Sequence, residues 1–154
     1  MYGTFVTGLT VLLIIVGSCG SSLPSTSAKW SLQLTTSGGF AGVGRGSLSV
    51  SSDGKYKHAR AARDVIKGCD STFTSGQLKP IADAVEKAHP EDWSRPGLEV
   101  AAADAFGYQL ELRRAGQTFT AKWYDNTSEQ LPEDLRNLSE ALLKAMDTSC
   151  TIAP

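Results

Sequence analysis

The chain has 154 residues, of which 15 are Lys or Arg and 16 are Asp or Glu, so its formal net charge is −1. A charge this close to zero indicates no class of partner, and the length excludes more than one ordinary domain. The information therefore lies in the order of the elements and in the distribution of charge along the chain.

The first predicted element is an export signal. Residues 6–16 are almost wholly apolar, a run too short for a comfortable membrane span of about 20 residues. The sequence Val-Gly-Ser-Cys that ends at Cys19 resembles a bacterial lipobox, although no Lys or Arg precedes the apolar run. A buried N-terminal strand or helix is the alternative. We predict a lipoprotein signal peptide over 1–19, lipidation at Cys19, a polar tether over 20–28 and a lipid-anchored location in the bacterial cell envelope.

Alternation predicts two strands near the start of the remaining chain. Apolar and polar residues alternate within 29–36, so one face of that strand should be buried. Residues 47–51 alternate again, and Asp53 with Gly54 forms a hairpin-type turn that leads to a possible further strand. The stretch over 60–70 fits either a helical turn or an irregular crossing.

A glycine-rich turn with one aromatic residue lies between these two strands. Its residues are Ser37, Gly38, Gly39, Phe40, Ala41 and Gly42. Adjacent glycines adopt positive φ at little steric cost, and bare backbone beside one large apolar side chain suits entry into a narrow cleft. The turn carries no group for chemistry, so we predict a partner-binding site. The alternative is that Phe40 folds back into the core.

The second half of the chain predicts a helix, a hairpin and a final helix. Thr74 to Gln77 resembles a capping box before a helix whose apolar residues share one face. Residues 106–113 and 117–124 flank an Ala-Gly turn, which is typical of a β-hairpin. Pro132 then opens a helix with leucines at helical spacing.

Together these elements predict an α+β fold, a small antiparallel sheet of four to five strands with two helices packed on one face. Residues 29–154 are expected to form a single domain. The side chains expected to dominate its core are Trp30, Leu32, Leu34, Leu48, Val50, Leu78, Ile81, Val85, Leu110, Leu112, Phe119, Leu135, Leu138 and Leu142.

Two cysteines remain once Cys19 is assigned to lipid. An even pair in an exported domain favours a disulfide between Cys69 and Cys150, with two unpaired buried thiols as the alternative. The bridge would tie the segment before the first helix to the segment after the last, and would contribute about 2–4 kcal/mol.

Patterns of catalytic and metal-binding residues are missing from the sequence. The glycines at 42, 44 and 46 precede a strand-like segment, whereas a phosphate loop needs a helix there. The only histidines, His58 and His89, have no neighbouring ligand at metal spacing, and Asp104 alone makes no acid–base pair. We therefore expect no catalytic residue, no metal, no cofactor and no enzymatic activity.

The first half of the chain is basic, with seven basic residues against two acidic ones from Lys29 to Lys67. Such a patch can attract nucleic acid, anionic headgroups or an acidic protein, although most are solvated faces, and export argues against nucleic acid. The alternative function is a non-enzymatic envelope lipoprotein that binds an anionic or protein partner through this half. The residues concerned are Arg45, Lys55, Lys57, Arg60, Arg63 and Lys67.

The glycine motif over 37–42 and the order of the elements resemble emfourin, the protealysin-inhibitor family. The resemblance covers roughly residues 29–146, supported by 106–113, 118–125 and 131–143. It implies a protein inhibitor of thermolysin-like zinc metallopeptidases with a small α/β fold and no cofactor. The chain departs from the family in its leader, its cysteine pair and a longer segment over 56–73.

A physical interpretation of the loop accompanies this resemblance. Thermolysin-like enzymes favour a bulky apolar residue just after the cut bond, so Phe40 could fill that pocket while Gly38 and Gly39 lie along the cleft. Glycines let a strand of the enzyme pair with the loop backbone, and a loop held by two strands loses little entropy on docking. The expected partner is a secreted or periplasmic metallopeptidase.

Overall fold

The computed structural model describes residues 29–38, 45–62, 65–94, 98–99, 102 and 104–149. The elements follow in chain order as β1 Trp30–Gly38, β2 Ser47–Ser51, β3 Lys55–Ala62, β4 Val65–Thr72, α1 Ser75–Lys87, the 3-10 turn η1 Pro90–Asp92, β5 Phe106–Arg114, β6 Gln117–Tyr124, the 3-10 turn η2 Asp125–Gln130 and α2 Glu133–Thr148.

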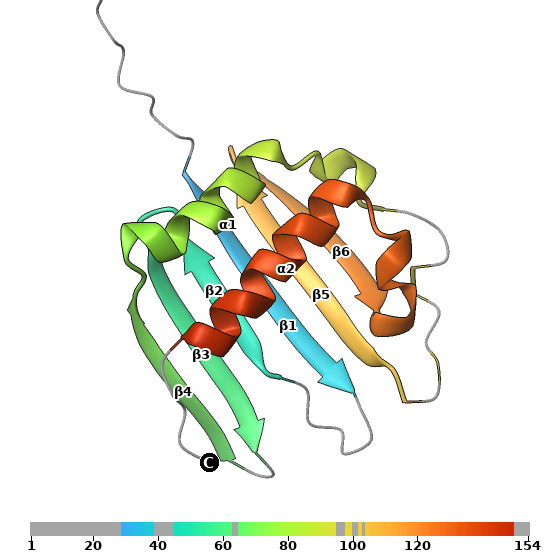
Figure 1. Cartoon of the computed structure of the whole chain (residues 1–154), viewed down its shortest axis with the longest axis horizontal. Helices are drawn as coiled ribbons and strands as arrows, with labels where there is room; N and C mark the ends of the chain where they lie inside the picture. Colours follow the sequence, from blue (N-terminus) through green and yellow to red (C-terminus); the bar gives the residue numbers. More distant parts are fainter. Residues whose placement is uncertain are drawn as a thin grey trace, which may run out of the picture.

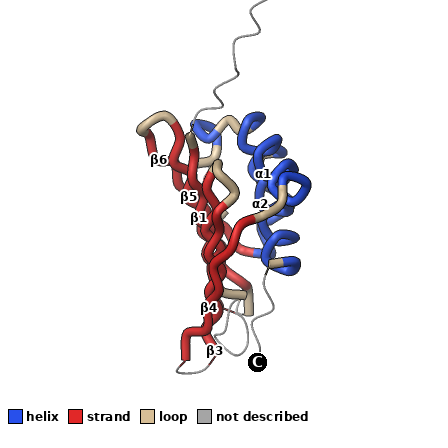
Figure 2. Tube along the Cα trace, turned by 90° about the vertical axis from the view of Figure 1, so that its left-hand side faces the viewer, coloured by secondary structure: helices blue, strands red, loops and turns tan. Residues whose placement is uncertain are grey.

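The strands form one antiparallel sheet in the order β4-β3-β2-β1-β5-β6 (Figure 1). Both helices lie on the same side of this sheet, and no described helix covers its other face, called the open face below (Figure 2). The predicted α+β class is therefore confirmed, whereas the predicted count of four to five strands is wrong because the sheet has six.

The missed strand explains the wrong count. Neither a helical turn nor an irregular crossing occupies the described part of 60–70, where β3 continues to Ala62 and β4 begins at Val65. β4 lies at the edge of the sheet, and its side chains from Lys67 to Thr72 are exposed or half-buried. None of the described side chains of this edge strand is fully buried, so the sequence carried little alternating signal for it.

The core lies between the helices and the sheet. All the predicted core residues are buried except Leu78 and Phe119, which are half-buried and pack against the others. Four large aromatic residues that alternation did not select are also buried: Tyr56, Phe73, Trp93 and Trp123. Within the described residues, neither helix has the length and apolar character needed to cross a bilayer.

Local interactions set the ends of the helices. Thr74 caps α1 in a reciprocal capping box with Gln77, as predicted. The guanidinium of Arg114, at the end of β5, donates to the carbonyls of Val85 (2.8 Å) and Ala88 (3.3 Å). A cation placed on these last carbonyls stabilises the carboxyl end of α1 and ties it to the sheet.

Candidate functional site

The predicted binding loop leaves the sheet at the end of β1. Ser37 is exposed and lies opposite Gly107 on β5. Gly38 has a φ of +83°, and a Cβ there would lie 2.7 Å from the carbonyl oxygen of Ala105, so only glycine fits without strain. The other predicted site residues, Gly39, Phe40, Ala41 and Gly42, lie outside the described residues, and the position of Phe40 stays a prediction.

The chain leaves the sheet at Gly38 and returns to it at Gly46, which is held by Thr36. The carbonyl of Gly46 accepts hydrogen bonds from the backbone N–H (2.8 Å) and the hydroxyl (3.1 Å) of Thr36, whose side chain is buried. Gly46 has a φ of +101°, and a Cβ there would collide with the backbone of Ala59 and Arg60. Two glycines and one threonine therefore hold both ends of the loop on the sheet.

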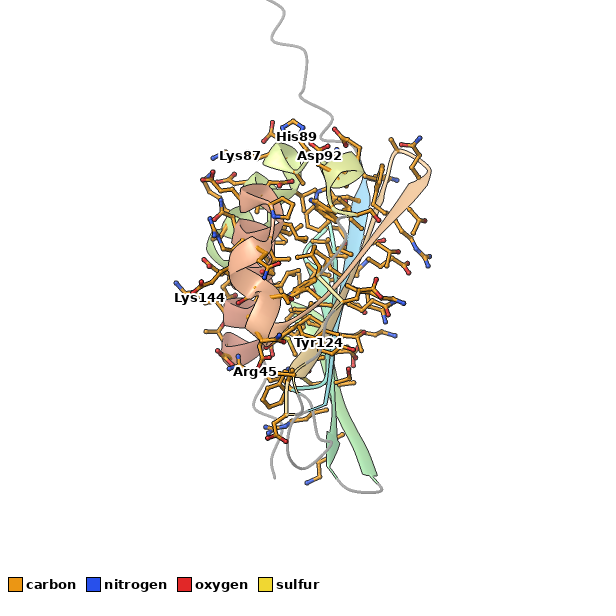
Figure 3. The ribbon with its side chains drawn as sticks, turned by 90° about the vertical axis from the view of Figure 1, so that its right-hand side faces the viewer. Arg45, Lys87, His89, Asp92, Tyr124 and Lys144 are labelled. Carbon is orange, nitrogen blue, oxygen red and sulfur yellow. The ribbon has the colours of Figure 1, made fainter. Side chains whose placement is uncertain are left out.

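The ring of Tyr124 lies near the start of the loop. Gly107 leaves room for the ring of Tyr124, since a Cβ at Gly107 would lie 3.3 Å from that ring and 3.0 Å from the Ser37 hydroxyl. Figure 3 shows Tyr124 and Arg45 at one end of the molecule, whereas Lys87, His89 and Asp92 lie at the opposite end. The Arg45 side chain is 3.8 Å from Asp147, an exposed ion pair that contributes little to stability.

His58 fills the core beneath this loop end. Its Nδ1 lies 2.6 Å from the hydroxyl of Ser149, and both side chains are buried. Ser149 donates its single hydroxyl proton to the carbonyl of Met146 (2.8 Å), so the imidazole N–H donates to the serine oxygen. Burial lowers the pKa of His58, and the Arg60 charge acts in the same direction. Ser149 is the C-cap residue of α2, so this contact joins β3 to the end of that helix.

The structure divides the basic residues of the first half between two faces. Lys55 and Lys57 point from β3 to the open face, whereas alternation places Arg60 on the same side as buried His58. Lys55 forms a 2.9 Å ion pair with Asp53, whose pKa is held well below its usual range by this hydrogen bond. Lys57 lies opposite Asp70 on β4. The side chain of Arg63 lies outside the described residues.

The remaining predicted sites are only partly described. Cys69 on β4 is half-buried and disulfide-bonded, whereas Cys150 lies outside the described residues, as do Cys19 and the rest of 1–28. His58 is the register partner of Cys69, and its bond to Ser149 brings the residue before Cys150 into the same region. This arrangement is compatible with the predicted Cys69–Cys150 bridge, which stays a prediction.

Sequence reasoning did not identify the groups that hold the loop ends. In the sequence, nothing distinguishes Thr36 from the other polar residues of its strand. Its contact with Gly46 depends on the pairing of β1 with β2. Gly107 between two aromatic residues was the available signal for the Tyr124 contact. Among the described side chains, no group of three or more His, Cys, Asp or Glu residues could hold a metal ion.

Comparisons of the chain with protein-family models and with curated proteins gave no match.

Proposed function

We propose that this chain is a protein inhibitor of thermolysin-like zinc metallopeptidases, and that it inserts residues 37–42 into the cleft of the enzyme. In this proposal Phe40 enters the apolar pocket of the enzyme, and the glycines beside it allow close approach of the two backbones. The inhibitor is not an enzyme, needs no cofactor and is anchored by lipid at Cys19 in the cell envelope.

The observation that carries the proposal is the fixed base of the loop. Thr36 binds the Gly46 carbonyl through two donors, and tight packing at Gly38 and Gly46 sets where the chain leaves and re-enters the sheet. A loop with constrained ends has less conformational entropy to lose on docking, which favours tight binding. Ser37 on the open side of the sheet provides the approach to the predicted contact residues.

The test is a titration of the full chain, in a mild detergent, against a thermolysin-like peptidase with a peptide substrate. We expect Phe40→Ala to weaken inhibition by about 2 kcal/mol, roughly 30-fold, with little change in the free energy of unfolding. Gly39→Val should weaken inhibition more than the matched loop-end change Arg45→Ala. Absence of inhibition at micromolar wild-type protein, or full inhibition by Phe40→Ala, would contradict the proposal.

Salt separates this mode of binding from the basic-patch alternative. Insertion of an apolar side chain should change little as ionic strength rises, whereas attraction through Lys55, Lys57 and their neighbours should weaken steeply. The same titration repeated at high salt therefore distinguishes the two. Trp93, a large aromatic residue elsewhere in the described chain, offers no contact surface to a partner, because it is 1% exposed and its indole N–H binds Asp134.

A further inference from the structure

A cavity of about 330 Å³ lies between α2, η2 and the last two strands. Its aromatic wall consists of Tyr108 and Trp123, whose rings stack with their centroids 5.4 Å apart and their planes 10° apart. Leu131 and Leu143 supply apolar walls from the helical layer. Ligand pockets for small molecules begin at about 300 Å³, so this cavity has room for at least one long side chain.

The mouth of the cavity is acidic. Asp125, Glu129 and Glu140 line it with exposed carboxylates, against the single guanidinium of Arg136. Arg136 is half-buried and also lines the neighbouring cavity beside His89, so its charge is shared between the two. No ion pair within the described part of the chain neutralises the three carboxylates.

Tyr108 connects the apolar wall with the acidic mouth. Burial raises the pKa of its hydroxyl, and the Asp125 carboxylate, which lines the same cavity, acts in the same direction. The Arg45 charge acts in the opposite direction and more strongly than Asp125, although Arg45 is not among the residues that line the cavity. The cavity therefore combines an aromatic surface with negative charge at its rim.

We propose that this cavity is a docking site for a lysine or arginine side chain presented by a protein partner. The aliphatic stem of such a residue would pack against Leu131 and Leu143, while its charged head would stay at the mouth near the carboxylates. A cation beside the face of Tyr108 gains a further attraction from the ring. A purely apolar side chain would leave the acidic mouth without a counter-charge.

The position of the cavity favours a macromolecular partner. Tyr108 lies opposite Thr36 in the register of β5 with β1, and Thr36 is the residue that closes the glycine-rich loop. A protein that approaches this end of the sheet from its helical side can therefore reach the cavity. The inference does not depend on the identity of that partner as a peptidase.

The experiment uses the full chain, ¹⁵N-labelled and held in a mild detergent, with short capped peptides as probes. Gly-Arg-Gly and Gly-Lys-Gly are compared with Gly-norleucine-Gly, which has the lysine stem without its charge, and with Gly-Glu-Gly. The readout is the indole N–H signal of Trp123, assigned with Trp123→Phe. We expect saturable shifts with low-millimolar Kd for the basic peptides only, and weaker binding at high salt.

A pair of charge reversals tests the site itself. Glu140→Lys should weaken binding of the arginine peptide about tenfold, because an attraction becomes a repulsion at the mouth. Glu86→Lys makes the same change on the exposed face of α1, away from the cavity, and should leave the Kd unchanged. The proposal is overturned if norleucine binds as well as arginine, if no peptide gives a saturable shift, or if the two reversals weaken binding equally.

Discussion

His58 joins three parts of the molecule through one side chain. It lies on β3, it contacts Ser149 at the end of α2, and its neighbours include the charged residues Arg45, Arg60 and Asp147. Burial disfavours the charged imidazolium, so the folded protein binds a proton less readily at this residue than the unfolded chain does.

The first prediction concerns pH. Because the folded pKa of His58 lies below the ordinary value of 6.5, its contribution to stability is complete above that pH and is lost as pH falls through the lowered folded value. We expect the urea midpoint of the wild type to fall between about pH 7.5 and about pH 5.5, above the range in which most carboxylates titrate. The urea midpoint of His58→Gln should fall less over this interval. If it falls as much as that of the wild type, a group other than His58 takes up the protons.

The second prediction concerns the loop base. Gly46→Ala should lower the free energy of unfolding by about 3 kcal/mol, because positive φ and a collision with the Ala59 backbone act together. Gly116→Ala is the matched control, since Gly116 has a φ of +78° but open space around its Cα. That change should cost about 1–2 kcal/mol, from φ alone. If urea denaturation gives the same loss of unfolding free energy for both variants, the collision at Gly46 does not contribute to the effect.

At the scale of the elements, Asp134 holds η1 against α2. Its Oδ2 accepts the backbone N–H of His89 (2.7 Å) and the indole N–H of Trp93 (2.9 Å). Asp134 also lies in the first turn of α2, where a negative charge interacts favourably with the helix dipole. One carboxylate thus holds the segment that follows α1 against the first turn of α2.

The third prediction follows from this carboxylate. Asp134→Ala should lower the free energy of unfolding by about 2–3 kcal/mol, because it leaves the buried Trp93 N–H without an acceptor. Asp83→Ala, which removes only an exposed ion pair with Lys79, should cost less than about 1 kcal/mol. The cost of Asp134→Ala should shrink in a Trp93→Phe background. If it does not, the indole contact is not the source of the effect.

At the scale of the whole molecule, the two ends of β1 serve different predicted roles. The predicted tether precedes Trp30 at one end, and the glycine-rich loop begins at Gly38 at the other (Figure 1). A strand of this length spans about 30 Å. The predicted lipidation site at Cys19 and the predicted binding loop therefore adjoin opposite ends of β1 along the chain.

The fourth prediction assigns the partner of Cys69. Mass spectrometry of the unreduced, digested protein should yield a peptide that links Cys69 to Cys150, and Cys150→Ser should leave a free thiol at Cys69. Loss of this bridge should lower the free energy of unfolding by about 2–4 kcal/mol, because the unfolded chain regains freedom. A peptide that links Cys69 to Cys19 would contradict both the pairing and the lipid assignment.

The sequence by itself determined the elements whose signals are local. Alternation around Leu32 and Leu48, the capping box at Thr74 and the leucine stripe of α2 each lie within one element, and the structure has all of them. These patterns also identified most of the core, because a residue on the apolar face of a regular element has few alternatives to burial.

Only the tertiary structure decided the features that join distant segments. β4 became a strand through pairing with β3, and Trp93 became a core residue through Asp134, 41 residues further along the chain. Contacts between distant segments also create two further features. These are the closure of the loop base by Thr36 and the cavity beside Tyr108. Each depends on contacts between residues far apart in sequence, and a periodic pattern within one segment does not specify which distant group will meet it.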